Sequence, residues 1–291
     1  MFPHRRDPDW PNATPDRFAA RVGRDAPAGP SVALLGMPDD QGVKLNHGRV
    51  GAAEGPAAFR ASLARYGTAF PAGFVWPAVF DAGDVQPGNE LEETHDRVTT
   101  AAAELTRRGH TVVGIGGGHD LTFALVRGVT SVSGPLAGVY LDAHLDVRAE
   151  RGSGMPFRRL LESGAATSMR VHGLDPFANS EEHVDWFLAH GGRIEESSDP
   201  AQEWPVGGCF LSLDLDVIDQ SAAPGVSAMN PCGWSSDLAE RWCFAAGAHS
   251  GLRCFDLMEL SPPHDAQGRT ARLAARLFLA FLRGFATRSG A

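Results

Sequence analysis

The sequence predicts one large α/β domain whose single, mainly parallel β-sheet is covered by helices on both faces. The 291 residues suffice for one large domain, and hydrophobic residues make up 43% of them. Strand-like and helix-like segments alternate along the chain. Continuous apolar runs such as residues 135–140 are typical of strands that are buried on both faces of a parallel sheet.

Composition narrows the function classes. The net charge is −9 and no dense basic run occurs, so nucleic acid is not an expected partner. No apolar stretch approaches the roughly 18 residues that cross a bilayer, and the basic N-terminus lacks the apolar segment of a signal peptide. The four cysteines show no Cys-x-x-Cys spacing, which favours free thiols. We therefore expect a protein of the reducing cytoplasm, with no membrane partner.

Residues 1–30 are polar and rich in Pro and Asp, and predict an irregular arm before a single domain at 31–291. Strands are predicted over Ser31–Gly36, Trp76–Val85, Pro135–Tyr140, Ser168–Leu174 and Leu252–Leu260, and from Thr111 and Cys209 onward. Helices are predicted over Pro56–Tyr66, Glu90–Arg108, Leu121–Val129, Arg158–Ser163, about Glu181–His190, Ser235–Ala246 and Thr270–Phe285. Ser235 or Ser236 is the expected N-cap of the sixth of these helices.

The segment after the predicted strand at 135–140 carries Asp142, His144 and Asp146 at every second position. Side chains alternate between the two faces of a strand, so an extended segment would point all three the same way. Two carboxylates and an imidazole that converge there are costly to desolvate unless a cation lies between them. The spacing therefore predicts a metal site.

Two other strands end in the same kind of residue. Asp214 and Asp216 follow the strand that begins at Cys209, and His119 follows a glycine turn after the strand from Thr111. Ligand sites in open α/β sheets lie at such carboxyl ends. Each motif alone is also typical of a solvated loop pair or a hydrogen-bonded core histidine. Together they predict six ligands: His119, Asp142, His144, Asp146, Asp214 and Asp216.

The charge of this set favours two divalent cations, because four carboxylates with two neutral imidazoles would overcharge a site with one. Oxygen-rich ligation fits manganese better than zinc, so two Mn²⁺ ions are the expected cofactors. Glu259, which ends the last strand, is a carboxylate beyond those that the metals need. It would pair with a cationic amidine or guanidine. Arg148 would meet a substrate carboxylate, and Arg49 and Asn179 lie in other loops after strands, although surface arginines and a turn residue are the plainer alternatives.

The chain resembles the ureohydrolases, the arginase and agmatinase superfamily. Three stretches carry the resemblance, namely Gly116-Gly117-Gly118-His119-Asp120, Asp142-Ala143-His144-Leu145-Asp146 and Ser212-Leu213-Asp214-Leu215-Asp216-Val217-Ile218-Asp219. The resemblance implies a three-layer α/β/α fold around an eight-stranded, mainly parallel sheet. It also implies a binuclear manganese centre that activates water against an amidino carbon, with Glu259 holding the cationic nitrogen of the substrate, and a trimer or hexamer.

Within this superfamily the chain is most similar to the formimidoylglutamase branch. The supporting stretches are 46–52, 153–157, 178–180 and 268–275, which add Asn46 and Ser153 to the expected substrate-binding residues. That likeness implies hydrolysis of N-formimidoyl-L-glutamate to glutamate and formamide in histidine degradation. This substrate has two carboxylates, for which Arg148 and Arg49 would be the cationic partners. Arginases place a proton-shuttling histidine near Ser153, which this chain lacks. We therefore expect Asp146 to pass the proton to the leaving nitrogen.

Other functions stay open at this point. An agmatinase or guanidino-acid hydrolase would release urea instead of formamide. A metal-dependent deacetylase can share the fold but would use one metal, which leaves the doubled Asp-x-Asp arrangement without a purpose. A metal-binding relative without activity is the non-enzyme alternative, and the complete ligand set argues against it.

Overall fold

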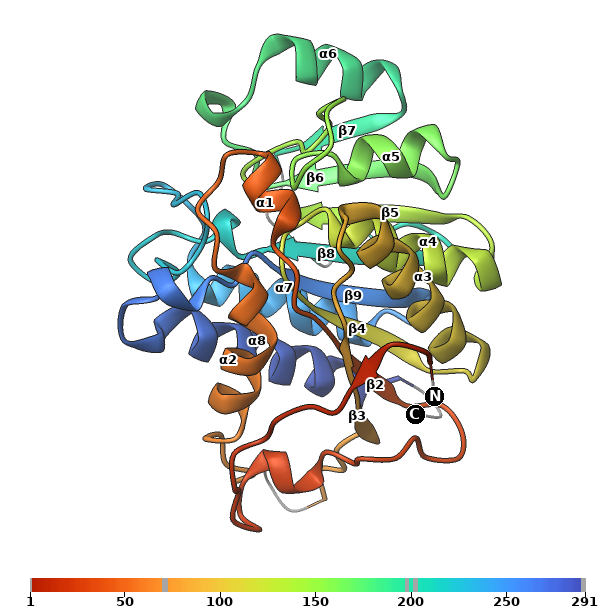
Figure 1. The fold of residues 1–291 in the computed structure, drawn as a ribbon, viewed down its shortest axis with the longest axis vertical. Coiled ribbons are helices and arrows are strands. Elements are labelled where there is room, and N and C mark those ends of the chain that lie inside the picture. Colours follow the sequence, from red (N-terminus) through yellow and green to blue (C-terminus); the bar gives the residue numbers. More distant parts are fainter. Residues whose placement is uncertain (1, 70–72, 197–198, 201–203, 289–291) are drawn as a thin grey trace.

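The computed structural model describes residues 2–69, 73–196, 199–200 and 204–288, which form one sheet between two layers of helices (Figure 1). The strands are β1 (Arg5–Arg6), β2 (Val32–Met37), β3 (Val79–Val85), β4 (Thr111–Gly116), β5 (Leu136–Leu141), β6 (Ala166–His172), β7 (Gly192–Glu195), β8 (Cys209–Asp214) and β9 (Leu252–Met258). The α-helices are α1 (Gln41–Leu45), α2 (Gly55–Leu63), α3 (Leu91–Arg107), α4 (Leu121–Ser133), α5 (Pro156–Glu162), α6 (Glu181–Ala189), α7 (Ser236–Ala248) and α8 (Arg269–Phe285). The predicted fold class is confirmed.

The strand order is β1-β3-β2-β4-β9-β8-β5-β6-β7, and every neighbouring pair is parallel except β1 with β3. Strands β4, β9, β8 and β5 are consecutive in the middle of the sheet. Parallel strands end at the same edge, so the loops that follow these four strands meet above the centre of the sheet. Segments that are distant in sequence are neighbours there: Gly114 of β4 pairs with Asp256 of β9.

Alternating side chains divide the core into two layers. In β2, Leu34 belongs to a core cluster that includes residues of α2, α7 and α8, whereas Leu35 belongs to the other cluster, which includes residues of α3, α4 and α5. Both leucines are fully buried. This burial on both faces explains why the central strands are continuous apolar runs. Among the described residues, no helix is long and apolar enough to cross a membrane.

The structure differs from the predicted elements mainly at the sheet edges. Its described part contains nine strands, against the eight that the family resemblance implied. The sequence pattern did not reveal β1, which has only two residues, or β7, which reads Gly-Arg-Ile-Glu and has one apolar side chain. The third strand begins at Val79 rather than Trp76. Ser235 is the N-cap of α7, because its side chain accepts a hydrogen bond from the backbone N–H of Leu238.

A buried ion-pair cluster attaches α2 to β3. Arg60 has a side chain that is only 3% exposed, and it donates to Asp81 at 2.7 Å and to Asp84 at 2.6 Å. Two residues of the N-terminal segment join from outside, because Trp10 Nε1 donates to Asp81 at 2.7 Å and Arg6 pairs with Asp84 at 3.2 Å. The cluster therefore connects residues before β2 to the edge of the sheet.

Replacing Arg60 by methionine should lower the free energy of unfolding by roughly 3–5 kcal/mol, because two buried carboxylates lose their shared cation. Urea denaturation of the metal-free protein would measure this. Arg107→Met is the matched control, since Arg107 is 58% exposed and pairs with Glu104 on the surface of α3. It should cost less than about 1 kcal/mol. Equal losses in both variants would contradict the role of the cluster.

Candidate metal centre

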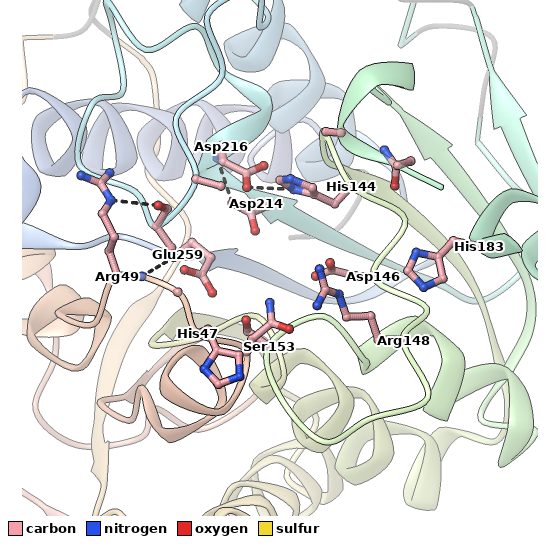
Figure 2. Close-up of a pocket in the computed structure, with 16 residues that line it drawn as sticks. His47, Arg49, His144, Asp146, Arg148, Ser153, His183, Asp214, Asp216 and Glu259 are labelled. Atoms are coloured by element: carbon pink, nitrogen blue, oxygen red, sulfur yellow. Dashed lines mark hydrogen bonds and ion pairs between the residues drawn. The ribbon is translucent and has the colours of Figure 1, made fainter. Parts of the chain in front are cut away.

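Histidine and carboxylate side chains gather where the four central strands end. His119 follows β4, Asp142 follows β5, Asp214 is the last residue of β8 and Glu259 follows β9. These four residues are 0–4% exposed. Figure 2 shows Asp214, Glu259 and neighbouring polar side chains facing a common space. The sheet topology alone thus brings together groups from four distant parts of the sequence.

A glycine turn delivers His119 to this position. A β-carbon on Gly117 would lie 2.2 Å from the carbonyl oxygen of Asp39 and 2.5 Å from that of Met37, so no larger residue fits between these backbone groups. The Gly117 N–H donates to Met37 O at 3.1 Å, and Gly117 O accepts from Glu259 N–H at 3.0 Å. These hydrogen bonds therefore hold the turn between the ends of β2 and β9, which limits where the His119 ring can lie.

One group of possible metal ligands surrounds Nδ1 of His119. This atom lies 3.2 Å from Asp142 Oδ2, 3.0 Å from Asp146 Oδ2 and 3.1 Å from Asp214 Oδ2. One ligand atom from each of these four residues lies within 4.8 Å of the others, which is close enough for a single ion. Nδ1 has no hydrogen-bond partner among the described residues. A buried lone pair facing three carboxylates is suited to a cation.

A second group shares Asp142 with the first. His144 Nδ1 lies 3.4 Å from Asp142 Oδ1 and 3.1 Å from Asp216 Oδ2. One ligand atom each from Asp142, His144 and Asp216 again lies within 4.8 Å of the other two. Asp142 Oδ2 and Asp216 Oδ1 are buried without a hydrogen-bond partner in the described part of the chain. The two groups fit a pair of ions that share one carboxylate.

These side chains converge through turns, which differs from the extended segment that the spacing suggested. Strand β5 ends at Leu141, and Asp142 Oδ1 accepts from the N–H of His144 at 2.6 Å. Asp214 Oδ1 accepts from the N–H of Asp216 at 2.8 Å in the same way. In both motifs an aspartate turns the chain by bonding the backbone two residues later. Asp146 reaches the cluster from a backbone with φ of 48°, which is unusual for a non-glycine residue.

The electrostatics of the cluster favour a cation. Burial, together with the charge of Asp216, raises the pKa of Asp214 well above its usual range, and burial raises the pKa of Asp216 to about 6. The charge of Asp216 raises the pKa of His144. Buried carboxylates thus hold or share protons when nothing else neutralises them, and a divalent ion would replace those protons.

Above the cluster lies a cavity of about 280 Å³. His144, Asp146, Asp214, Asp216 and Glu259 line it, while His119 and Asp142 lie buried beneath. The residues that the sequence suggested for substrate binding also line it, namely Asn46, Arg49, Arg148, Ser153 and Asn179. The structure therefore brings all the predicted site residues to one place. Their side chains make different kinds of contact there.

Arg148 and Arg49 differ in what holds them. The Arg148 guanidinium makes no hydrogen bond or ion pair with any other described residue, and a β-carbon on Gly154 would lie 2.9 Å from Arg148 Cδ, so this glycine gives the side chain its room. Arg49 instead donates from Nε to Ser227 O at 2.9 Å and from Nη2 to Val226 O at 2.5 Å. Its guanidinium points away from the carboxylates in Figure 2. Arg49 thus ties two cavity loops together, and Arg148 is available to a ligand.

The amide of Asn179 is fully engaged with backbone. Its Oδ1 accepts from Leu145 N–H at 2.9 Å, and its Nδ2 donates to Ala143 O at 2.9 Å and to Asp175 O at 2.8 Å. Two of these partners lie between Asp142 and Asp146. Asn179 therefore holds the loop that carries three of the predicted ligands, a role that its position in the sequence did not indicate.

Sequence reasoning missed two histidines of the cavity, His47 and His183. Figure 2 shows His183 and Arg148 on the side of the cavity opposite Arg49. His47 lies within the stretch 46–52 and has φ of 58°, which the sequence could not show. His183 lies near the start of α6, where a half-buried histidine gives no periodic signal.

Comparison with known proteins gives a consistent family. The family model described as "Arginase family" matches residues 30–283. A formimidoylglutamase of Ralstonia nicotianae is 36% identical over 294 residues, which cover 91% of this chain and 89% of the relative. A formimidoylglutamase of Halobacterium salinarum is 36% identical over 275 residues, covering 86% of this chain and 87% of the relative.

Solved structures agree. Trypanosoma cruzi formiminoglutamase with Mn²⁺ has a TM-score of 0.81 and 30% identity, covering 89% of this chain and 94% of that one. Proclavaminate amidino hydrolase from Streptomyces clavuligerus has a TM-score of 0.82 and 28% identity, covering 95% and 99%. The structural similarity therefore extends over most of the chain.

Replacing Asn179 by alanine should speed hydrogen exchange at the Leu145 amide and lower the free energy of unfolding by about 1–3 kcal/mol, because buried backbone groups lose their partners. Hydrogen exchange followed by mass spectrometry or NMR would measure the first effect and urea denaturation the second. Asn89→Ala is the control, since Asn89 is exposed and its hydrogen bond to Glu93 uses the backbone N–H. Unchanged protection at Leu145 would show that the amide does not hold this loop.

Proposed function

The chain belongs to the arginase family, and on that premise we propose that it is a manganese-dependent formimidoylglutamase, which hydrolyses N-formimidoyl-L-glutamate to L-glutamate and formamide. Two kinds of evidence support the proposal. Formimidoylglutamases are 31–36% identical to the chain over most of its length, and formiminoglutamase structures share its fold. The chain is thus a hydrolase of the arginase family whose substrate is the point to test.

The observation that carries the proposal is the pair of ligand groups that share Asp142. We assign one Mn²⁺ ion to His119, Asp142, Asp146 and Asp214, and the second to Asp142, His144 and Asp216. Manganese is favoured because carboxylate oxygens outnumber imidazole nitrogens in both groups, and because structural relatives were solved with Mn²⁺. When bound, a pair of divalent ions lowers the pKa of water and polarises the group under attack.

The reaction breaks one carbon–nitrogen bond. Water adds to the amidino carbon, the bond from that carbon to the glutamate nitrogen breaks, and a proton passes to the departing nitrogen. We assign Glu259 to the cationic amidino group of the substrate. Its Oε1 is held by the His119 N–H at 2.9 Å, while its buried Oε2 has no hydrogen-bond partner among the described residues. An oriented and unpartnered carboxylate is suited to a charge-assisted contact with an amidinium.

Two carboxylates of the substrate require a cationic partner, and we assign that role to Arg148. Its guanidinium lines the cavity and is unpaired among the described residues, so binding would not break an existing ion pair. We keep Asn46 and Ser153 as substrate-binding residues, because both are neutral polar residues that line the cavity. Arg49 and Asn179 contribute through the loops they hold, because their side chains already bond to backbone groups.

The proton for the departing nitrogen comes, in this proposal, by way of Asp146. This residue lines the cavity, and its Oδ2 lies 3.0 Å from His119 Nδ1. The loop near Ser153 offers no histidine to replace it. Asp146 would therefore both bind metal and move a proton.

The proposal has further consequences for the cell. It places the enzyme in histidine degradation, and the four cysteines, all of them free thiols, suit a reducing cytoplasm. A trimer or hexamer is the expected assembly from the family resemblance.

A second candidate is an amidino hydrolase that releases urea from a guanidino compound. The likeness to proclavaminate amidino hydrolase favours it, because that structure covers nearly the same share of the chain as the formiminoglutamases do. The product distinguishes the two functions, since a formimidoyl substrate yields formamide and a guanidino substrate yields urea.

We expect manganese-loaded protein to convert N-formimidoyl-L-glutamate into equal amounts of glutamate and formamide. Agmatine, 4-guanidinobutyrate and arginine should react with a kcat/KM at least about 100-fold lower, because they lack the second carboxylate or the formimidoyl carbon. Chelation with EDTA should abolish turnover and added Mn²⁺ should restore it. Urea released from a guanidino compound at the higher kcat/KM would favour the second candidate instead.

Replacing Arg148 by methionine should raise KM for formimidoylglutamate about 10- to 100-fold, because a charge-assisted contact is worth roughly 1.5–3 kcal/mol. The effect on kcat should be smaller. Gly154→Ala should act in the same direction by displacing the Arg148 side chain. Steady-state kinetics at saturating Mn²⁺ would measure both variants.

Arg151→Met is the matched control for Arg148, since Arg151 lies three residues away and pairs with Glu92 outside the cavity. It should leave KM within about twofold of the unaltered enzyme, as expected for a surface ion pair. If Arg148→Met and Arg151→Met change KM equally, Arg148 does not bind the substrate.

A further inference from the structure

Behind His119, on the side away from the carboxylates, lies a second set of buried polar contacts. His119 Nε2 is 2.9 Å from Ser212 Oγ, and Ser212 Oγ donates to Asp256 Oδ1 at 2.6 Å. Ser212 and Asp256 are 0% and 1% exposed. None of the metal-binding or substrate-binding roles assigned so far uses these two residues.

The sheet register sets this arrangement. Ser212 of β8 and Asp256 of β9 are directly paired in parallel register, so their side chains lie next to each other on one face. On the other side of Asp256 the paired residue is Gly114 of β4. A β-carbon on Gly114 would lie 3.3 Å from Asp256 Cβ and 2.9 Å from a Leu125 methyl carbon. The absence of a side chain there leaves Asp256 the space it occupies.

Metal binding at Nδ1 would determine which nitrogen of His119 carries the hydrogen. If Nδ1 binds a cation, as the proposed function requires, Nδ1 must present a lone pair and the hydrogen must sit on Nε2. Nε2–H then donates to Ser212 Oγ, and the serine hydroxyl hydrogen is directed to Asp256. Each group in the chain has a defined donor and acceptor, and the ring cannot rotate without leaving buried polar atoms unpaired.

We propose that Ser212 and Asp256 are positioning residues that orient the His119 ring, keep its hydrogen on Nε2, and so tighten metal binding at Nδ1. This inference rests on the proposed metal site and adds two residues to it. Histidine ligands commonly donate their second N–H to an acceptor that fixes the ring. Here the acceptor is a hydroxyl, and the carboxylate acts one step further away.

Asp256 is suited to be the last acceptor in this series of hydrogen bonds. Burial raises the pKa of its carboxyl to about 6, and its Oδ2 has no hydrogen-bond partner among the described residues. The hydroxyl of Thr122 on α4 lies 3.3 Å from Ser212 Oγ and is a further polar group of this buried set. The carboxylate thus strengthens the serine as an acceptor without itself approaching the ion.

The test compares Mn²⁺ affinity in Ser212→Ala, Asp256→Asn and Ser31→Ala by competition with a metal indicator, with free Mn²⁺ followed by EPR. Ser31 is the matched control, because it is a buried serine bonded to a histidine, His110, at 2.9 Å but precedes β2 at the opposite end of the strands. Ser212→Ala should weaken binding of one ion about 10- to 100-fold. Ser31→Ala should leave affinity unchanged even if it lowers stability.

Asp256→Asn keeps an oxygen that can accept from Ser212 but removes the charge, so its loss of affinity should be smaller than that of Ser212→Ala. If Ser212→Ala does not fold without metal, Asp256→Asn still tests the inference. Mn²⁺ affinity within about twofold of the Ser31→Ala value in both variants would overturn this inference and leave the proposed function intact. If the unaltered protein binds no Mn²⁺, the proposed function fails first and the inference with it.

Discussion

The dominant constraint on this structure is the burial of several carboxylates within a few ångströms of one another. Asp142, Asp214 and Glu259 are 0%, 3% and 4% exposed, and each is a costly group to remove from water. Neighbouring histidines and backbone N–H groups that bond one oxygen of each carboxylate reduce this cost, and the proposed cations would reduce it further. The surrounding strands contribute apolar side chains to both layers of the core.

The order of the strands turns this constraint into a layered site. The deepest layer is the pair formed by Ser212 and Asp256 inside the sheet, the middle layer is His119, and the carboxylates lie above it at the strand ends. The cavity with Arg148 opens above them. Each layer comes from strands that are adjacent in space but distant in sequence, so a shift of register in β8 or β9 would disturb all the layers together.

The sequence predicted the fold class and the gathering of the six proposed ligands, because both follow from strong local signals: apolar strands that end in Asp or His. Other features depend on tertiary contacts. Asn179 reads as a turn residue until the structure shows that Leu145 and Ala143 are its partners. Arg49 is a free cation as far as the sequence indicates. In the structure it donates to the carbonyl oxygens of Ser227 and Val226, which lie 178 and 177 residues further along the chain. Asp256 lies inside an apolar strand, and only the register with Ser212 reveals its neighbour.

The short antiparallel strand β1 has a consequence for solubility. Without it, β3 would present unpaired backbone groups along an open sheet edge, a surface on which other chains can add strands and aggregate. Arg5 and Arg6 cover that edge in register with Val85 and Asp84, and Arg5 Nε donates to Ala82 O at 2.6 Å. The opposite border, β7, is only four residues long and carries Arg193 and Glu195. Both edges of the sheet thus disfavour the addition of strands from other molecules. At β3 the two residues of β1 pair with the edge, and β7 is short and carries charged side chains.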